Sequence, residues 1–213
     1  MGFKQISKNE AEALAYLNSS TPLNEVAILV RQYQSCALKA VKNSPSNSSV
    51  YLVAVEYSEV AANYIFKQAV AQNLLYALVK CAHHKYLAEQ LIGHHSPIVR
   101  ASCTRHHDLA IKLKNDSNEY VRNACCQWLD ILESIENDPS KTVRNRQIIS
   151  SPTMAMKYLL NGDPQDQELA IRSWINCAKY ALASSDPKLN LLSQKVFSAL
   201  VTGNPKLDVK ATT

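Results

Sequence analysis

The chain has few of the residues that interrupt helices or build sheets. Only four glycines and three phenylalanines occur among 213 residues, whereas alanine and leucine are abundant. Glycine destabilises helix interiors and aromatic residues favour strands, so this composition favours an all-helical fold. Hydrophobic residues make up 46% of the chain and charged residues 19%, which excludes a disordered protein.

Export and membrane signals are also missing. No apolar run approaches the roughly 20 residues that span a bilayer, and residues 1–7 lack the apolar core of a signal peptide. Six cysteines without an export signal indicate free thiols, so we expect a cytoplasmic protein without a membrane partner. The net charge of +5 is spread along the chain and forms no basic domain or tail.

Motifs for catalysis are lacking as well. The sequence contains no G-x-S-x-G, Walker A, G-x-G-x-x-G or H-E-x-x-H motif. It therefore predicts no catalytic or cofactor-binding residue, and it favours a protein that is not an enzyme.

A 22-residue period is the main positive signal. It relates three cysteines and three Val-Arg pairs: Cys81, Cys103 and Cys125; Val99, Val121 and Val143; Arg100, Arg122 and Arg144. A fixed period of this length predicts stacked helical units that share a continuous core. Each unit also contains a polar corner, and Asp116, Asp138 and Asp163 at these corners can cap the helix that follows.

These units resemble the leucine-rich repeat variant family and, more loosely, HEAT-like repeats. The segments NDPSKTVR (137–144), NDSNEYVR (115–122) and HHSPIVR (94–100) resemble its D-P-x-x-x-V-R helix start. The resemblance covers about residues 81–172 and implies an all-α, right-handed α-solenoid in which the cysteine positions are small and buried. The founding member is associated with an iron–sulfur cluster held by a separate N-terminal cysteine cluster. Only Cys36 precedes residue 81 here, so no cofactor is expected.

We expect one continuous domain. It comprises an N-terminal helical portion (1–80), the variant repeats (81–175), C-terminal capping helices (176–205) and a disordered tail (206–213). In the N-terminal portion the apolar pattern predicts helices over 8–18, from Pro22 to about Lys42, and over 50–81 with a break near 72–73. The corner Asp186–Pro187 predicts one more unit, and Asn204–Pro205 ends the ordered chain.

All six histidines occur in adjacent pairs, at 83–84, 94–95 and 106–107. Because histidine and cysteine are the preferred ligands of zinc, His83, His84, His106 and His107 are candidate metal ligands. Their spacing matches no zinc motif, and equivalent positions in neighbouring units lie about 8–10 Å apart, too far for one ion. We therefore favour a structural role at the helix ends and predict no metal.

The arginines allow two interpretations. Arg100, Arg122 and Arg144 could form a basic stripe for phosphate or carboxylate groups, or each could pair with a corner aspartate. The regular polar corner six residues before each arginine favours pairing. Arg105 and Arg146 fall outside the pattern, and with His94 and His95 they are the candidate partner contacts.

The favoured function is a non-enzymatic scaffold that binds another protein through its concave face. One alternative is a nucleic-acid-binding protein related to the HEAT-like glycosylases of alkylated DNA bases. Trp128, Asp130 and Trp174 would then supply the aromatic residues and the carboxylate. A second alternative is metal binding through the histidine pairs.

Overall fold

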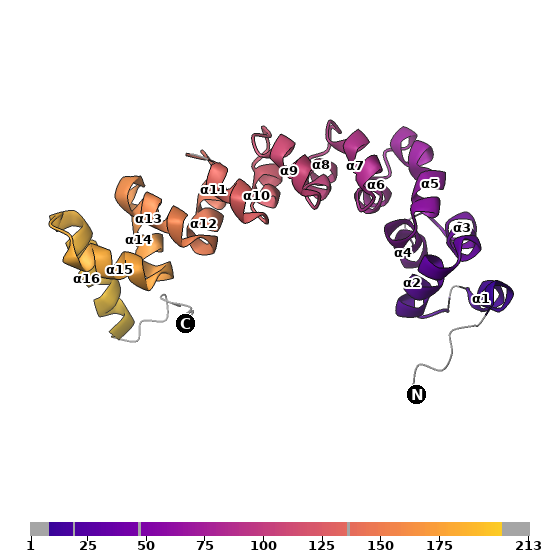
Figure 1. Cartoon of the computed structure of the whole chain (residues 1–213), viewed down its shortest axis with the longest axis horizontal. Coiled ribbons are helices and arrows are strands. Elements are labelled where there is room, and N and C mark those ends of the chain that lie inside the picture. The colour runs from indigo at the N-terminus through magenta and orange to yellow at the C-terminus, as the bar shows by residue number, and fades with distance from the viewer. Residues whose placement is uncertain (1–8, 19, 47, 136, 202–213) are drawn as a thin grey trace. The chain divides into compact units, whose positions relative to one another are not determined.

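The computed structural model describes residues 9–18, 20–46, 48–135 and 137–201, and within these ranges all regular structure is helical (Figure 1). The all-α prediction is therefore confirmed. The predicted tail at 206–213 and the corner Asn204–Pro205 lie outside the described residues. None of the described helices is both long enough and apolar enough to cross a bilayer.

The chain divides into two compact units, Met1–Leu113 and Lys114–Thr213. The first contains α1 (Glu10–Tyr16), α2 (Leu23–Gln32), α3 (Gln34–Asn43), α4 (Ser49–Tyr57), α5 (Glu59–Ala71), α6 (Leu75–Cys81), α7 (Lys85–Leu91), α8 (Pro97–Cys103) and α9 (His107–Leu113). The second contains α10 (Glu119–Cys125), α11 (Leu129–Ser134), α12 (Lys141–Ser150), α13 (Pro152–Asn161), α14 (Pro164–Ser173), α15 (Ile175–Ala183) and α16 (Pro187–Val201).

The sequence period appears as a period of helix pairs. Helices α6, α8 and α10 each have seven residues and begin 22 residues apart, and so do the starts of α7, α9 and α11. The three periodic cysteines end α6, α8 and α10, where none is exposed to solvent. A small, weakly polar thiol suits this buried position, because it lets a neighbouring helix pack closely.

Helix packing is local within each unit. In the first unit α2 contacts α4, α4 contacts α6, and α6 contacts α8, while α3 contacts α5. In the second unit the same spacing joins α10, α12, α14 and α16, and α13 contacts α15. Each of these contacts joins helices that are two apart along the chain, as expected when equivalent helices of successive units stack side by side.

Two of the predicted long helices are wrong. The helix predicted from Pro22 to Lys42 is interrupted at Tyr33, and the stretch 50–81 is interrupted at Ser58 as well as near 72–74. The interruptions at Tyr33 and Ser58 are each a single residue in an extended conformation, with φ of −128° and −126°. Apolar periodicity continues across such a residue, so the sequence pattern alone does not reveal it.

The same one-residue break recurs in the second unit, at Ser151 between α12 and α13 and at Trp174 between α14 and α15. The hydroxyls of Ser58 and Ser151 accept hydrogen bonds from the amides of Ala61 and Met154, which caps the following helix. The break thus ends one helix and starts the next without a loop.

The corner aspartates have two roles. Asp163 is the N-cap of α14 and accepts hydrogen bonds from the amides of Gln165 and Asp166, both at 2.9 Å, as predicted. Asp116 and Asp138 instead accept from the amides two residues later, at 2.8 Å in both cases. These two aspartates therefore close the turn before the helix. The N-cap residues of α10 and α12 are Asn118 and Ser140.

Candidate binding surface

Each periodic arginine is held by its own corner. The Nη1 atom of Arg122 donates to the carbonyl oxygens of Asp116 (2.8 Å) and Ser117 (3.1 Å). The other two arginines repeat this arrangement with the residues six and five positions earlier: His94 and His95 for Arg100, and Asp138 and Pro139 for Arg144. The guanidinium therefore satisfies carbonyl groups that the sharp corner leaves without helical partners.

In the second unit these arginines also bridge to the next corner. Arg122 forms a two-point contact with Asp138, with Nε–Oδ2 and Nη2–Oδ1 distances of 2.6 and 2.9 Å. Arg144 contacts Asp166 at 2.7 Å and Asp163 at 3.2 Å. Burial tends to raise the pKa of Asp138, but the hydrogen bonds from Arg122 and from the Ser140 amide outweigh it, and the pKa is lowered. Arg122 and Arg144 are thus engaged within the protein and do not form a phosphate-binding stripe.

In two of the three pairs, one histidine contacts a backbone carbonyl oxygen of an earlier part of the chain. The Nε2 atoms of His84 and His106, 22 residues apart, lie 2.8 Å from the Val55 carbonyl oxygen and 2.9 Å from that of Ala82. A carbonyl oxygen only accepts, so Nε2 carries the proton in both rings. Trp174 precedes α15 as His84 precedes α7, and its indole N–H donates to the Ile148 carbonyl at 2.6 Å.

The other histidine of the first pair belongs to a charged cluster. Glu56 on α4 forms an ion pair with Lys80, and its other oxygen lies 3.5 Å from Nδ1 of His83. Burial, and after it the charge of Arg105, lower the pKa of His83 to about 4 against the opposing effect of Glu56. His83 is therefore neutral near pH 7. His83 and Arg105 are 22 residues apart, and Glu56 acts electrostatically on both.

The histidines at the α7–α8 corner lie against each other, with the ring centres of His94 and His95 4.2 Å apart. The amide of Ser96 donates to Nδ1 of His94 at 3.1 Å, which places the proton of the neutral ring on Nε2. Burial is the main cause that lowers the pKa of His94, and the charges of His95 and Arg100 add to it. His95 itself is exposed.

The candidate metal ligands do not assemble into a site. Within the described ranges, no group of three or more His, Cys, Asp or Glu side chains is arranged to hold a metal ion. The Nε2 atoms of His84 and His106 already face carbonyl oxygens. Burial raises the pKa of Cys81 and Cys103 to about 12, which opposes the thiolate form that zinc requires.

Exposed apolar residues at the same position of three helices are the feature that sequence reasoning missed. The second residues of α6, α8 and α10 are Tyr76, Ile98 and Tyr120, whose exposed fractions are 70%, 53% and 56%. These residues also lie 22 apart, and that spacing could have revealed them. Tyr76 and Ile98 lie on helices of the first unit that contact each other, so this pair is a candidate contact surface.

Arg105 lies in the turn between α8 and α9, and Arg146 lies on α12. Both side chains are exposed, and neither forms a hydrogen bond or an ion pair with another residue that the structure describes. They differ in this respect from Arg122 and Arg144.

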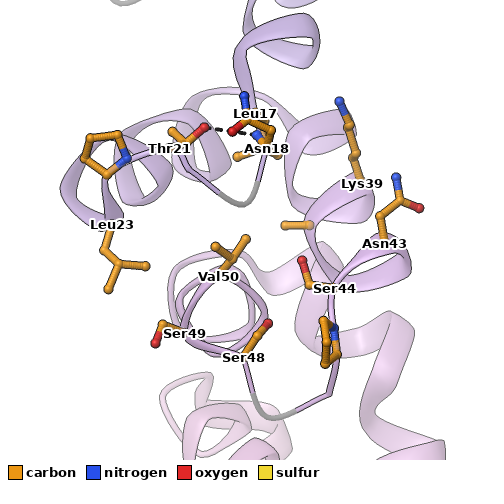
Figure 2. A pocket seen from close by; sticks show the side chains of 13 residues that line it. Leu17, Asn18, Thr21, Leu23, Lys39, Asn43, Ser44, Ser48, Ser49 and Val50 are labelled. Carbon is orange, nitrogen blue, oxygen red and sulfur yellow. Dashed lines mark hydrogen bonds between the residues drawn. The ribbon is translucent and has the colours of Figure 1, made fainter.

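A pocket of about 660 Å³ lies in the first unit (Figure 2). Its lining side chains come from the turn at 17–23, from the end of α3 and from the start of α4. Lys39 is the charged side chain in this lining, and its Nζ donates to the Leu14 carbonyl at 2.5 Å. Thr21 is likewise engaged, with the Tyr16 carbonyl and the Asn18 amide. Among the described residues, this lining therefore contains no acid–base pair for catalysis.

The residues named for a glycosylase-like site serve structural positions. Trp128 is the half-buried N-cap of α11, and Asp130 is exposed in the first turn of that helix. The indole of Trp174 is engaged with the Ile148 carbonyl, as described above. Comparison with protein-family models, curated proteins and solved structures finds no match to this chain.

Proposed function

We propose that the protein is a right-handed α-solenoid of short helical repeats that binds another protein and carries out no reaction of its own. The fixed spacing of α6 to α11 and the contacts between helices two apart support the solenoid. The local sequence resemblance to variant leucine-rich repeats supports the repeat type. Function cannot follow from a fold alone, so the binding role rests on the surface.

The observation that carries this role is the exposed pair Tyr76 and Ile98, on helices α6 and α8, which contact each other within the first unit. Tyrosine is enriched at protein interfaces, because it buries a large apolar ring while its hydroxyl remains hydrated. Each residue is the second of its helix, and that position faces solvent both times. A partner that covers the pair would bury apolar area that the protein itself leaves in water.

Affinity capture from the native host tests the proposal. The bait is the full chain, compared with the variant Tyr76→Ser/Ile98→Ser. A control variant carries Ile111→Ser and Tyr180→Ser, which are exposed apolar residues on α9 and α15 outside this pair. We expect a protein that co-purifies with wild type and with the control but is lost with the variant of the pair. Equal recovery with all three baits, or no specific partner, would contradict the proposal.

A further inference from the structure

The pocket of about 660 Å³ in the first unit has the size and the mixed lining of a small-molecule site (Figure 2). Such sites are about 300–1,000 Å³ in volume and combine apolar walls with a few well-placed polar groups. The apolar residues of this lining are Leu17, Pro22, Leu23, Ala40, Pro45 and Val50. Leu23 is 45% exposed, so part of the apolar wall is accessible to a ligand.

Two polar residues of the lining lie together on α3. Lys39 and Asn43 are four residues apart on this helix, and side chains at that spacing are neighbours on one face, with Cβ atoms about 5–6 Å apart. The side-chain amide of Asn43 forms no hydrogen bond with another residue that the structure describes. The Lys39 ammonium group has three N–H donors and donates to the Leu14 carbonyl, so donors remain for a ligand.

The charge of Lys39 is not neutralised at this pocket. Lys39 forms no ion pair with another residue that the structure describes, and the described lining contains no Asp or Glu. A carboxylate could accept hydrogen bonds from both Lys39 and Asn43, and a charge-assisted hydrogen bond is roughly twice as strong as a neutral one. The pocket therefore places one positive charge and one amide donor beside an apolar wall.

We propose that this pocket binds a small monocarboxylic acid with an apolar body. The carboxylate accepts from Lys39 and Asn43, and the apolar body lies against Leu23 and Val50. A single lysine matches one negative charge, whereas a phosphate monoester carries about −1.5 to −2 at pH 7. Tyr76 and Ile98 are not in the lining, so this inference goes beyond the proposed protein partner and does not depend on it.

Octanoate is the probe, and isothermal titration calorimetry with the full chain at pH 7 measures its dissociation constant. Three related compounds test the parts of the ligand. Octan-1-ol has the same apolar body without the charge, octylamine has the opposite charge, and acetate has the carboxylate without the apolar body. We expect octanoate to bind at least about tenfold more tightly than each of them, because each lacks either the charge-assisted hydrogen bonds or the buried chain.

Lys39→Met keeps the length of the side chain and removes its charge. It should weaken octanoate binding at least about tenfold and leave the affinity for octan-1-ol unchanged. The matched control Lys67→Met changes an exposed lysine of α5 outside the lining and should alter neither affinity. Asn43→Ala should also weaken octanoate, and it retains the contact of Lys39 with Leu14, so it tests the head-group site even if Lys39→Met perturbs the fold.

The apolar wall is tested by Leu23→Ser, which should weaken the binding of both octanoate and octan-1-ol. The control is Leu129→Ser. Like Leu23, Leu129 is the exposed first residue of a helix, but it lies outside the lining, so both affinities should stay unchanged.

Equal octanoate affinity in wild type, Lys39→Met and Asn43→Ala would overturn the head-group site, and equally tight binding of octylamine would overturn the preference for an anion. If octanoate does not bind, or if Leu23→Ser leaves its affinity unchanged, this pocket is not a site for such acids. Each of these results overturns the inference, and the affinity capture decides the proposed function separately.

Discussion

At the scale of single residues, Gln147 shows how the protein departs from its own repeat. It stands 22 residues after Cys125 and is completely buried, where the three preceding units have cysteine. Its side-chain amide donates to the carbonyls of Leu132 and Ile135 and accepts from the Tyr158 hydroxyl, at 2.7–2.8 Å. The amide thus satisfies carbonyl groups at the end of the six-residue helix α11.

Replacing Gln147 by Ala should therefore destabilise the protein by about 3 kcal/mol, because three buried polar groups lose their partner and a cavity forms. Urea denaturation followed by circular dichroism measures this loss. The control Gln68→Ala changes an exposed glutamine on α5 and should shift the free energy of unfolding by less than about 0.5 kcal/mol. Similar losses in the two variants would show that the buried amide is not important.

The periodic cysteines give a second prediction at this scale. Burial raises the pKa of Cys81, Cys103 and Cys125 to about 12, so at pH 8 their thiolate fraction is far below that of an exposed cysteine. A thiol reagent such as DTNB should leave them unmodified in the native protein and modify them rapidly in urea. Rapid native-state reaction at these positions, mapped by mass spectrometry, would contradict their role as packing residues.

At the scale of elements, the fixed feature is the link between a helix and the next corner. Arg122 on α10 holds its own corner through carbonyl groups and the following corner through Asp138. The sequence predicted an aspartate partner from the spacing of corners and arginines. It could not predict which aspartate, because the choice depends on how far a side chain reaches between stacked helices.

Arg122→Ala should cost about 3 kcal/mol of unfolding free energy, since it leaves the buried carboxylate of Asp138 without its partner. Arg146→Ala removes an exposed arginine without such contacts and should cost less than about 0.5 kcal/mol. Chemical denaturation at pH 7 compares the two. The contribution of Asp138 should be complete above its ordinary pKa of 3.8 and should disappear as the pH falls through its lowered folded value.

At the scale of the whole molecule, stability should depend on mildly acidic pH through His83. The pKa of His83 is near 6.5 when unfolded and is lowered to about 4 in the fold, mainly by burial. As the pH falls, His83 is therefore protonated in the unfolded chain before it is protonated in the folded protein. The free energy of unfolding is unaffected by this group above pH 6.5 and decreases as the pH falls from 6.5 toward 4.

Urea midpoints measured between pH 7.5 and 4.5 should fall for the wild type, and the fall should be smaller in His83→Gln. The exposed His95→Gln is the control and should retain the slope of the wild type. Equal slopes in all three proteins would contradict the burial of a neutral imidazole at position 83.

The sequence by itself determined the helical class and the 22-residue helix period, and its resemblance to variant repeats implied the burial of the cysteines. The class and the period follow from local composition and from side chains that recur at one phase, which residues along the chain suffice to specify. It also singled out Arg105 and Arg146, because both interrupt that phase.

Only the tertiary structure decided which polar groups are engaged and which remain exposed. The acceptors of His84 and His106 are carbonyl oxygens that lie 29 and 24 residues away in the chain. A carbonyl acceptor has no signature in the local sequence, since it is a property of what surrounds a residue in space.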